Sequence, residues 1–142
     1  MKKLVFLILL LLPSLCFADR IQQLINSQTS FVYRGDHDWD RTKPEFDAAA
    51  VGSYTDWDLS AIVPAGAKTV VLFVSGKDTT VGVSLSLRKN GDTYPTGVWY
   101  NIIDSVIVTG VYIVPLDSSG IIEYKYSANM GVLNVKVIGW FF

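Results

Sequence analysis

The chain has 142 residues, of which 50% are apolar and 18% are charged, and its formal net charge is −1. This composition excludes an intrinsically disordered chain and a long coiled coil. Without a basic excess, a nucleic-acid-binding protein is also disfavoured. The length fits one domain.

Residues 1–18 have the layout of an export signal. Two lysines precede an unbroken apolar run over residues 4–12, and the small residue Ala18 stands just before a cleavage position. The apolar run is too short to cross a bilayer, which takes roughly 20 residues. We therefore expect cleavage before Asp19, no stable membrane span in the processed chain, and a secreted, periplasmic or cell-surface protein. Cleavage would also remove Cys16, the only cysteine, and with it any disulfide or thiolate site.

Residues 19–30 follow the signal and carry Ile21, Leu24 and Ile25 at helical spacing. This spacing predicts a short N-terminal helix or arm. A β-sandwich domain is expected over residues 31–142.

From residue 48 onward, apolar side chains recur with a period of two, which indicates strands. No stretch between these strands has the pattern of a crossover helix, so the sequence predicts an all-β fold. We expect an antiparallel, jelly-roll-like β-sandwich of about eight strands. The clearest predicted strands cover residues 31–33, 70–74, 81–88, 105–114, 122–126 and 133–137.

Several turn and core motifs carry a family resemblance. They are Trp57-Asp58-Leu59-Ser60, Val63-Pro64-Ala65-Gly66-Ala67, Pro115-Leu116-Asp117 and Val137-Ile138-Gly139-Trp140-Phe141. With them, the chain resembles β-sandwich modules of phage tail fibres and of uncharacterised secreted bacterial proteins. The resemblance implies a structural or receptor-binding module, often oligomeric, and it brings no catalytic residue.

The loop over residues 35–47 holds the most chemically suggestive side chains. Alternating carboxylates can converge on a hard cation, which makes this loop a weak calcium candidate and calcium the only cofactor considered. A solvated acidic loop is the alternative, because Arg41 stands where a calcium loop has glycine. The single histidine, His37, can build neither a triad nor a zinc site, so no enzymatic activity is expected. The candidate calcium ligands are Asp36, Asp38, Asp40 and Asp47.

Aromatic residues supply the candidate ligand-binding patch. A Pro-Thr-Gly segment over residues 95–97 predicts a loop, and it is flanked by Tyr94, Trp99 and Tyr100. Trp39 lies in the acidic loop. Such rings can stack on a glycan or contact a protein receptor, or they can cap the core or an oligomer interface. Trp57 and Trp140, by contrast, lie in strand patterns that favour the core.

The C-terminal alternation that ends in Phe142 has three interpretations. It is the last core strand, an exposed strand that pairs with a neighbouring subunit, or the last strand of a small outer-membrane β-barrel. We take Phe31, Trp140 and Phe142 as candidate interface residues. The sequence thus predicts an exported, non-enzymatic structural module that forms a homo-oligomer, with a glycan- or receptor-binding module as the alternative.

Overall fold

The computed structural model describes residues 30–46 and 50–142. The predicted export signal, most of the predicted arm and Asp47 lie outside these residues. The folded unit spans Phe31–Phe142. Within the described part, no helix has the length and apolar content needed to span a bilayer.

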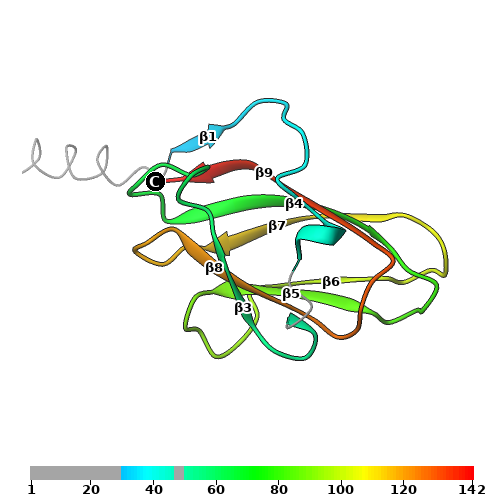
Figure 1. Ribbon diagram of the computed structural model, residues 1–142. Coiled ribbons are helices and arrows are strands. Elements are labelled where there is room, and N and C mark those ends of the chain that lie inside the picture. The colour runs from blue at the N-terminus through cyan, green and yellow to red at the C-terminus, as the bar shows by residue number, and fades with distance from the viewer. Residues whose placement is uncertain (1–29, 47–49) are drawn as a thin grey trace, which may run out of the picture. The chain divides into compact units, whose positions relative to one another are not determined.

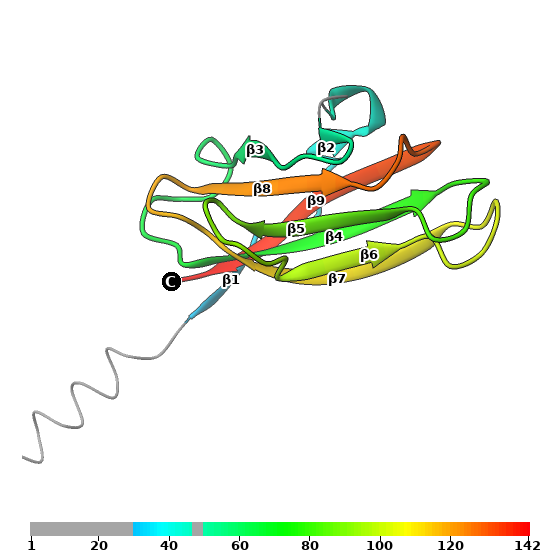
Figure 2. The ribbon, with the colours of Figure 1, turned by 90° about the horizontal axis from the view of Figure 1, so that it is seen from below.

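Two antiparallel sheets pack face to face, which confirms the predicted all-β sandwich (Figure 1). One sheet has the order β1-β9-β4-β7, and the short β2 also pairs with β9. The other has the order β3-β8-β5-β6, which can be followed across Figure 2. The strands are β1 (Phe31–Tyr33), β2 (Arg41–Thr42), β3 (Thr55–Asp58), β4 (Thr69–Lys77), β5 (Ser84–Lys89), β6 (Gly97–Tyr100), β7 (Val108–Pro115), β8 (Ile121–Tyr126) and β9 (Val132–Phe141); a 3-10 turn, η1 (Lys43–Glu45), follows β2.

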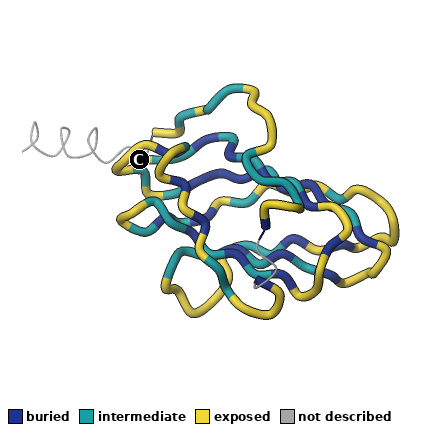
Figure 3. Tube along the Cα trace, viewed as in Figure 1, coloured by how far each residue is buried: buried dark blue, intermediate teal, exposed yellow. Residues whose placement is uncertain are grey.

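The core fills the space between the sheets and is built by the period-two pattern. Along β8, Ile122, Tyr124 and Tyr126 are buried while Glu123 and Lys125 are half-buried on the other side, as the alternation predicts. The same alternation holds in β9 from Leu133 to Val137 and shifts at a bulge beside Ile138, so that Trp140 opposes Val70. Figure 3 shows buried segments along the strands and exposed segments in the loops. The largest fully buried side chains are Trp99, Tyr124, Leu59, Leu72, Leu85, Leu87, Ile122 and Leu133.

Three strand predictions need correction. Residues 97–100, expected as a loop, form β6. The strand predicted from residue 81 begins at Ser84, because Val81 lies in the preceding turn, and the strand predicted from residue 105 begins at Val108. Of the three interpretations of the C-terminal strand, the last core strand is the one that fits and the exposed edge strand is wrong, since β9 pairs with β1 and β2 on one side and with β4 on the other.

A polar cluster ties together three loops at one end of the sandwich. The buried carboxylate of Asp78 accepts hydrogen bonds from the backbone N–H groups of Thr80 and Gly131, each at 2.7 Å. The side-chain amide of Asn101, which is fully buried, donates to the carbonyls of Asp78 and Thr80 at 3.0 and 2.9 Å. The N–H donors from Thr80 and Gly131 hold the pKa of Asp78 below its ordinary value of 3.8.

This cluster predicts a loss of stability in acid. Because the pKa of Asp78 is lower in the folded state, its stabilisation is complete above the ordinary carboxyl pKa and disappears as the pH falls through the depressed value. Asp78→Asn should therefore melt at a lower temperature than the wild type at neutral pH, with the two melting temperatures converging as the pH falls below the ordinary carboxyl pKa of 3.8. Asp92→Asn, at an exposed turn position, is the control. A constant gap between Asp78→Asn and wild type at all pH values would contradict the assignment.

Candidate functional site

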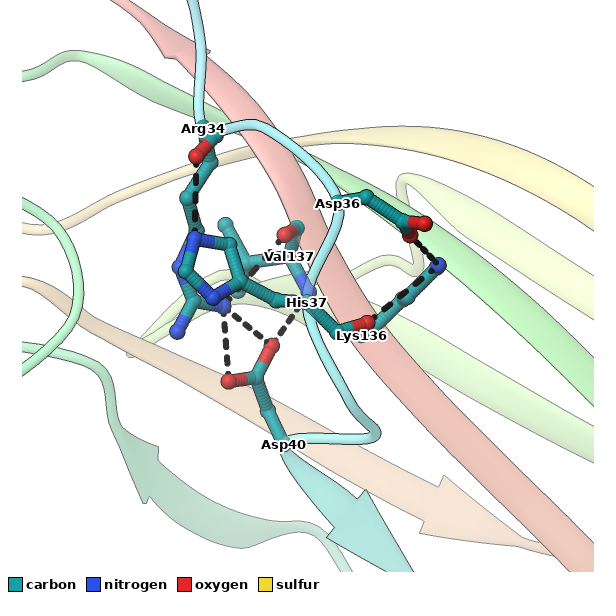
Figure 4. A network of polar contacts seen from close by, with 6 residues as sticks. All are labelled: Arg34, Asp36, His37, Asp40, Lys136 and Val137. Carbon is teal, nitrogen blue, oxygen red and sulfur yellow. Dashed lines mark hydrogen bonds and ion pairs between the residues drawn. The ribbon is translucent and has the colours of Figure 1, made fainter.

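The acidic loop is closed by the ion pair of Arg34 with Asp40 and is held against β9 by contacts to Val137 and Lys136 (Figure 4). Arg34 contacts both carboxylate oxygens of Asp40 at 2.6 and 2.5 Å, and Asp40 also accepts the backbone N–H of Val137 at 2.7 Å. Asp36 reaches Lys136 at 3.4 Å, and His37 contacts the carbonyl of Arg34 at 3.0 Å. The side chain of Asp40 is nearly buried, and its contact with Val137 fastens the connection between β1 and β2 to the central strand.

The calcium candidates are not brought together by this geometry. Asp40 faces Arg34 and Val137, while Asp36 and Asp38 are exposed and Asp47 lies outside the described residues. Across residues 30–46 and 50–142, no group of three or more metal-binding side chains is arranged around a common point. Calcium binding stays a prediction that would require Asp40 to leave Arg34.

The predicted aromatic patch is divided by the fold. Trp99 is 1% exposed and its indole N–H donates to the carbonyl of Val108 at 3.1 Å, so the assignment of Trp99 to a binding surface is wrong. Tyr94 and Tyr100 are exposed on the β5–β6 side of the four-stranded sheet. Trp39 stacks on Phe73 of the five-stranded sheet, with ring centroids 5.9 Å apart. Tyr94 lies in the β5–β6 loop and Tyr100 at the other end of β6, so the two exposed tyrosines share one hairpin but no contact between their rings forms a patch.

The predicted interface residues also separate into two groups. Phe31 and Phe142 are exposed, and Phe31 contacts Phe141 with ring centroids 5.0 Å apart. Trp140 pairs with Val70 and is partly buried against the core, which favours the core for this residue and leaves its interface role a prediction. The direction of the Trp140 side chain depends on how β9 pairs with β4, and the sequence of one strand does not contain that information.

A groove of about 430 Å³ lies between the loop that follows β3 and the turn that follows β7. Its walls include residues 63–68 and 116–120, two of the segments that carry the family resemblance. Asp117 at this groove accepts the backbone N–H groups of Ser119 and Ile121 and the side-chain amide of Asn90. These hydrogen bonds close the turn, so the carboxylate of Asp117 acts as a structural acceptor.

The outer face of the four-stranded sheet is polar and internally paired. Arg88 of β5 contacts Glu123 of β8 at 2.7 Å. The guanidinium of Arg88 also lies 3.5 Å from the ring centroid of Tyr54, and Lys125 lies 4.6 Å from the same ring. Since these charges are satisfied on the sheet itself, this face is stable in contact with water.

The outer face of the five-stranded sheet is largely apolar, and its central charge, Lys136, lies 5.7 Å from the ring centroid of Trp39 and 6.0 Å from that of Phe73. In β4, Val70, Leu72 and Val74 point into the core, so the alternate residues and their cross-strand partners point outward. Val111 and Ile113 of β7 are 58% and 54% exposed on this side. We call the set the apolar face: Phe31, Trp39, Val71, Phe73, Val111, Ile113 and Phe141.

The β6–β7 loop extends the apolar surface beyond the strand. Ser105 in this loop adopts a left-handed backbone conformation with φ 57°, and its N–H donates to the carbonyl of Asp78 at 2.9 Å. This hydrogen bond ties the β6–β7 loop to the turn that follows β4. Its exposed apolar residues are Ile102, Ile103, Val106 and Ile107.

Sequence reasoning did not identify the apolar face. The sequence did contain a sign of it. Residues 105–116 include no charged residue, and side chains on both sides of the predicted strand are mostly apolar. That pattern suits a strand covered on both faces, and only the sheet order reveals that the outer side of β7 is uncovered among the described residues.

Comparison with known proteins yields no matching family model and no match among curated proteins. The geometry of the chain itself therefore carries the functional inference.

Proposed function

We propose that this chain is an exported, non-enzymatic structural module that self-associates through the apolar face. The observation that carries the proposal is the contrast between the two outer sheet faces. One face pairs its charges within the sheet, as Arg88 and Glu123 do. The other presents Val111 and Ile113 to solvent beside Phe73 and Trp39. Contiguous exposed apolar surface of this kind is typical of protein interfaces.

The topology we propose for the module is a jelly roll. Its support is the strand order, since from β2 to β9 the chain crosses to the other sheet at every connection except that between β5 and β6. The sheet β1-β9-β4-β7 thereby lies over β3-β8-β5-β6. Jelly rolls are widely used in viral capsids and lectins, where the domain is a repeated unit of a larger assembly. That use agrees with the proposed role and is a likeness of architecture alone.

The oligomeric state tests the proposal. We expect the purified protein to sediment as an oligomer, and Val111→Lys to sediment mainly as a monomer, because a lysine on the apolar face would be desolvated on association. Val51→Lys is the matched control: Val51 is also an exposed valine, but it lies beside β8 of the other sheet. A wild-type protein that is monomeric at every concentration would rule out self-association.

Glycan or receptor binding is the second candidate function, favoured by the exposure of Tyr94 and Tyr100 near one hairpin. The same sedimentation experiment separates the candidates when it is combined with a glycan array. A monomer whose glycan binding is lost in Tyr94→Ala would favour this second function over assembly.

A further inference from the structure

We infer that two copies of this chain pair through β7, edge to edge and antiparallel, to form one continuous sheet. This inference rests on the proposed self-association and specifies its geometry. The partner is a second copy of the chain, and Val111 faces Val111 of that copy across a two-fold axis.

The four sheet edges differ in how well they are protected. The edge beside β9 is divided between β1, with three residues, and β2, with two. In the other sheet, β3 and β6 have four residues each, and β3 carries the exposed acids Asp56 and Asp58. Short and charged edges resist pairing with another strand.

The remaining edge, β7, lacks these protections. It has eight residues and pairs with β4 alone among the described strands. No charged residue occurs between Ser105 and Leu116, and proline appears in β7 only at its last position, Pro115. A long, uncharged edge strand offers unpaired backbone N–H and C=O groups to another strand.

Symmetry restricts the register of such a pair. Directly opposed residues of an antiparallel pair point to the same side, so a two-fold axis must place a residue opposite itself. An axis at Val111 lies at the middle of the outward-pointing row Thr109, Val111 and Ile113. Thr109 of each copy then faces Ile113 of the other, and the apolar faces of the two copies become continuous.

Charge does not oppose a second copy as the partner. The nearest acids flank β7 on both sides, at Asp104 and Asp117, and both lie outside the strand. With the axis at Val111, the paired segment therefore brings no like charges together. Its outward-pointing row is matched by the same row of the second copy.

Single cysteines test the register, since Cys16 is the only native cysteine and is replaced by alanine in every variant. Oxidation, or a short bifunctional maleimide, should join most of Val111→Cys into a covalent dimer, because opposed Cβ atoms lie about 5 Å apart. A mixture of Thr109→Cys and Ile113→Cys should form the mixed dimer. Val51→Cys, another exposed valine, should stay at the background level, and thermal melting confirms that each variant is folded.

The outcomes separate this inference from the proposed function. Cross-links at Val111 and between Thr109 and Ile113, with none at Val51, support edge pairing. An oligomer that is dissociated by Val111→Lys but lacks those cross-links overturns edge pairing and leaves association through the apolar face standing. A strictly monomeric protein overturns both.

Discussion

Trp99→Ala is expected to lower the free energy of unfolding by about 3–5 kcal/mol, the range for removing a large aromatic side chain from a core. The indole is 1% exposed, and it lies so close under β4 that a Cβ added at Gly76 would be 2.8 Å from the ring. Its N–H also fixes the start of β7 through the carbonyl of Val108. The loss therefore combines a cavity with a missing contact between β6 and β7.

Urea unfolding followed by circular dichroism measures this effect. Tyr100→Ala is the control, because Tyr100 is the next residue along β6 and is exposed. It should change the free energy of unfolding by less than about 0.5 kcal/mol, as surface substitutions usually do. Equal stability of Trp99→Ala and wild type would be incompatible with a core position for Trp99.

Gly139→Ala is expected to destabilise the fold by about 3 kcal/mol, at the upper end of the usual range for overpacking. A Cβ at this position would lie 2.5 Å from the backbone carbonyl oxygen of Val32 and 2.5 Å from the ring of Phe31. Because one of these neighbours is backbone, β1 must move away from β9. The Phe31–Phe141 contact would be lost with it.

Amide hydrogen exchange localises this change. The N–H of Arg34 donates to the carbonyl of Ile138 at 3.0 Å and should exchange faster in Gly139→Ala. Gly131→Ala is the matched control, since an added Cβ there meets only ordinary contacts, the nearest at 3.4 Å from the carbonyl of Lys77. Unchanged exchange at Arg34 would show that β1 tolerates the methyl group.

The period-two pattern was sufficient to predict the faces of β8 and of β9 as far as Val137, because alternation along one strand is a local property. It did not reveal the bulge at Ile138. It was not sufficient for β6 either, where a four-residue strand begins directly after Pro95-Thr96 and its signal is weaker than that of the turn. The pattern also could not show whether β9 lies in the middle of its sheet or at an edge. Whether a strand is central or at an edge depends on partners such as Phe31 for Phe141, which are far apart in the chain.

The candidate site was harder still to predict from the sequence, because it depends on how the strands and loops are arranged in space. Asp40 looked like a cation ligand because its carboxylate alternates with others, but its partner, Arg34, could be recognised only once the loop was closed. Val111 and Ile113 formed an ordinary apolar strand in the sequence. Their exposure follows from the position of β7 at the end of the sheet order.

The central position of β9 constrains when the domain can fold. The strand inserted between β1 and β4 is Val132–Phe141, so the five-stranded sheet cannot be completed until the ribosome has translated these residues. A nascent chain that stops before Val132 therefore lacks its final tertiary structure, although most of its strands have been made. Under the export we propose, a translocation channel that accepts only unfolded polypeptides would meet the chain in a suitable state as long as β9 has not yet been inserted.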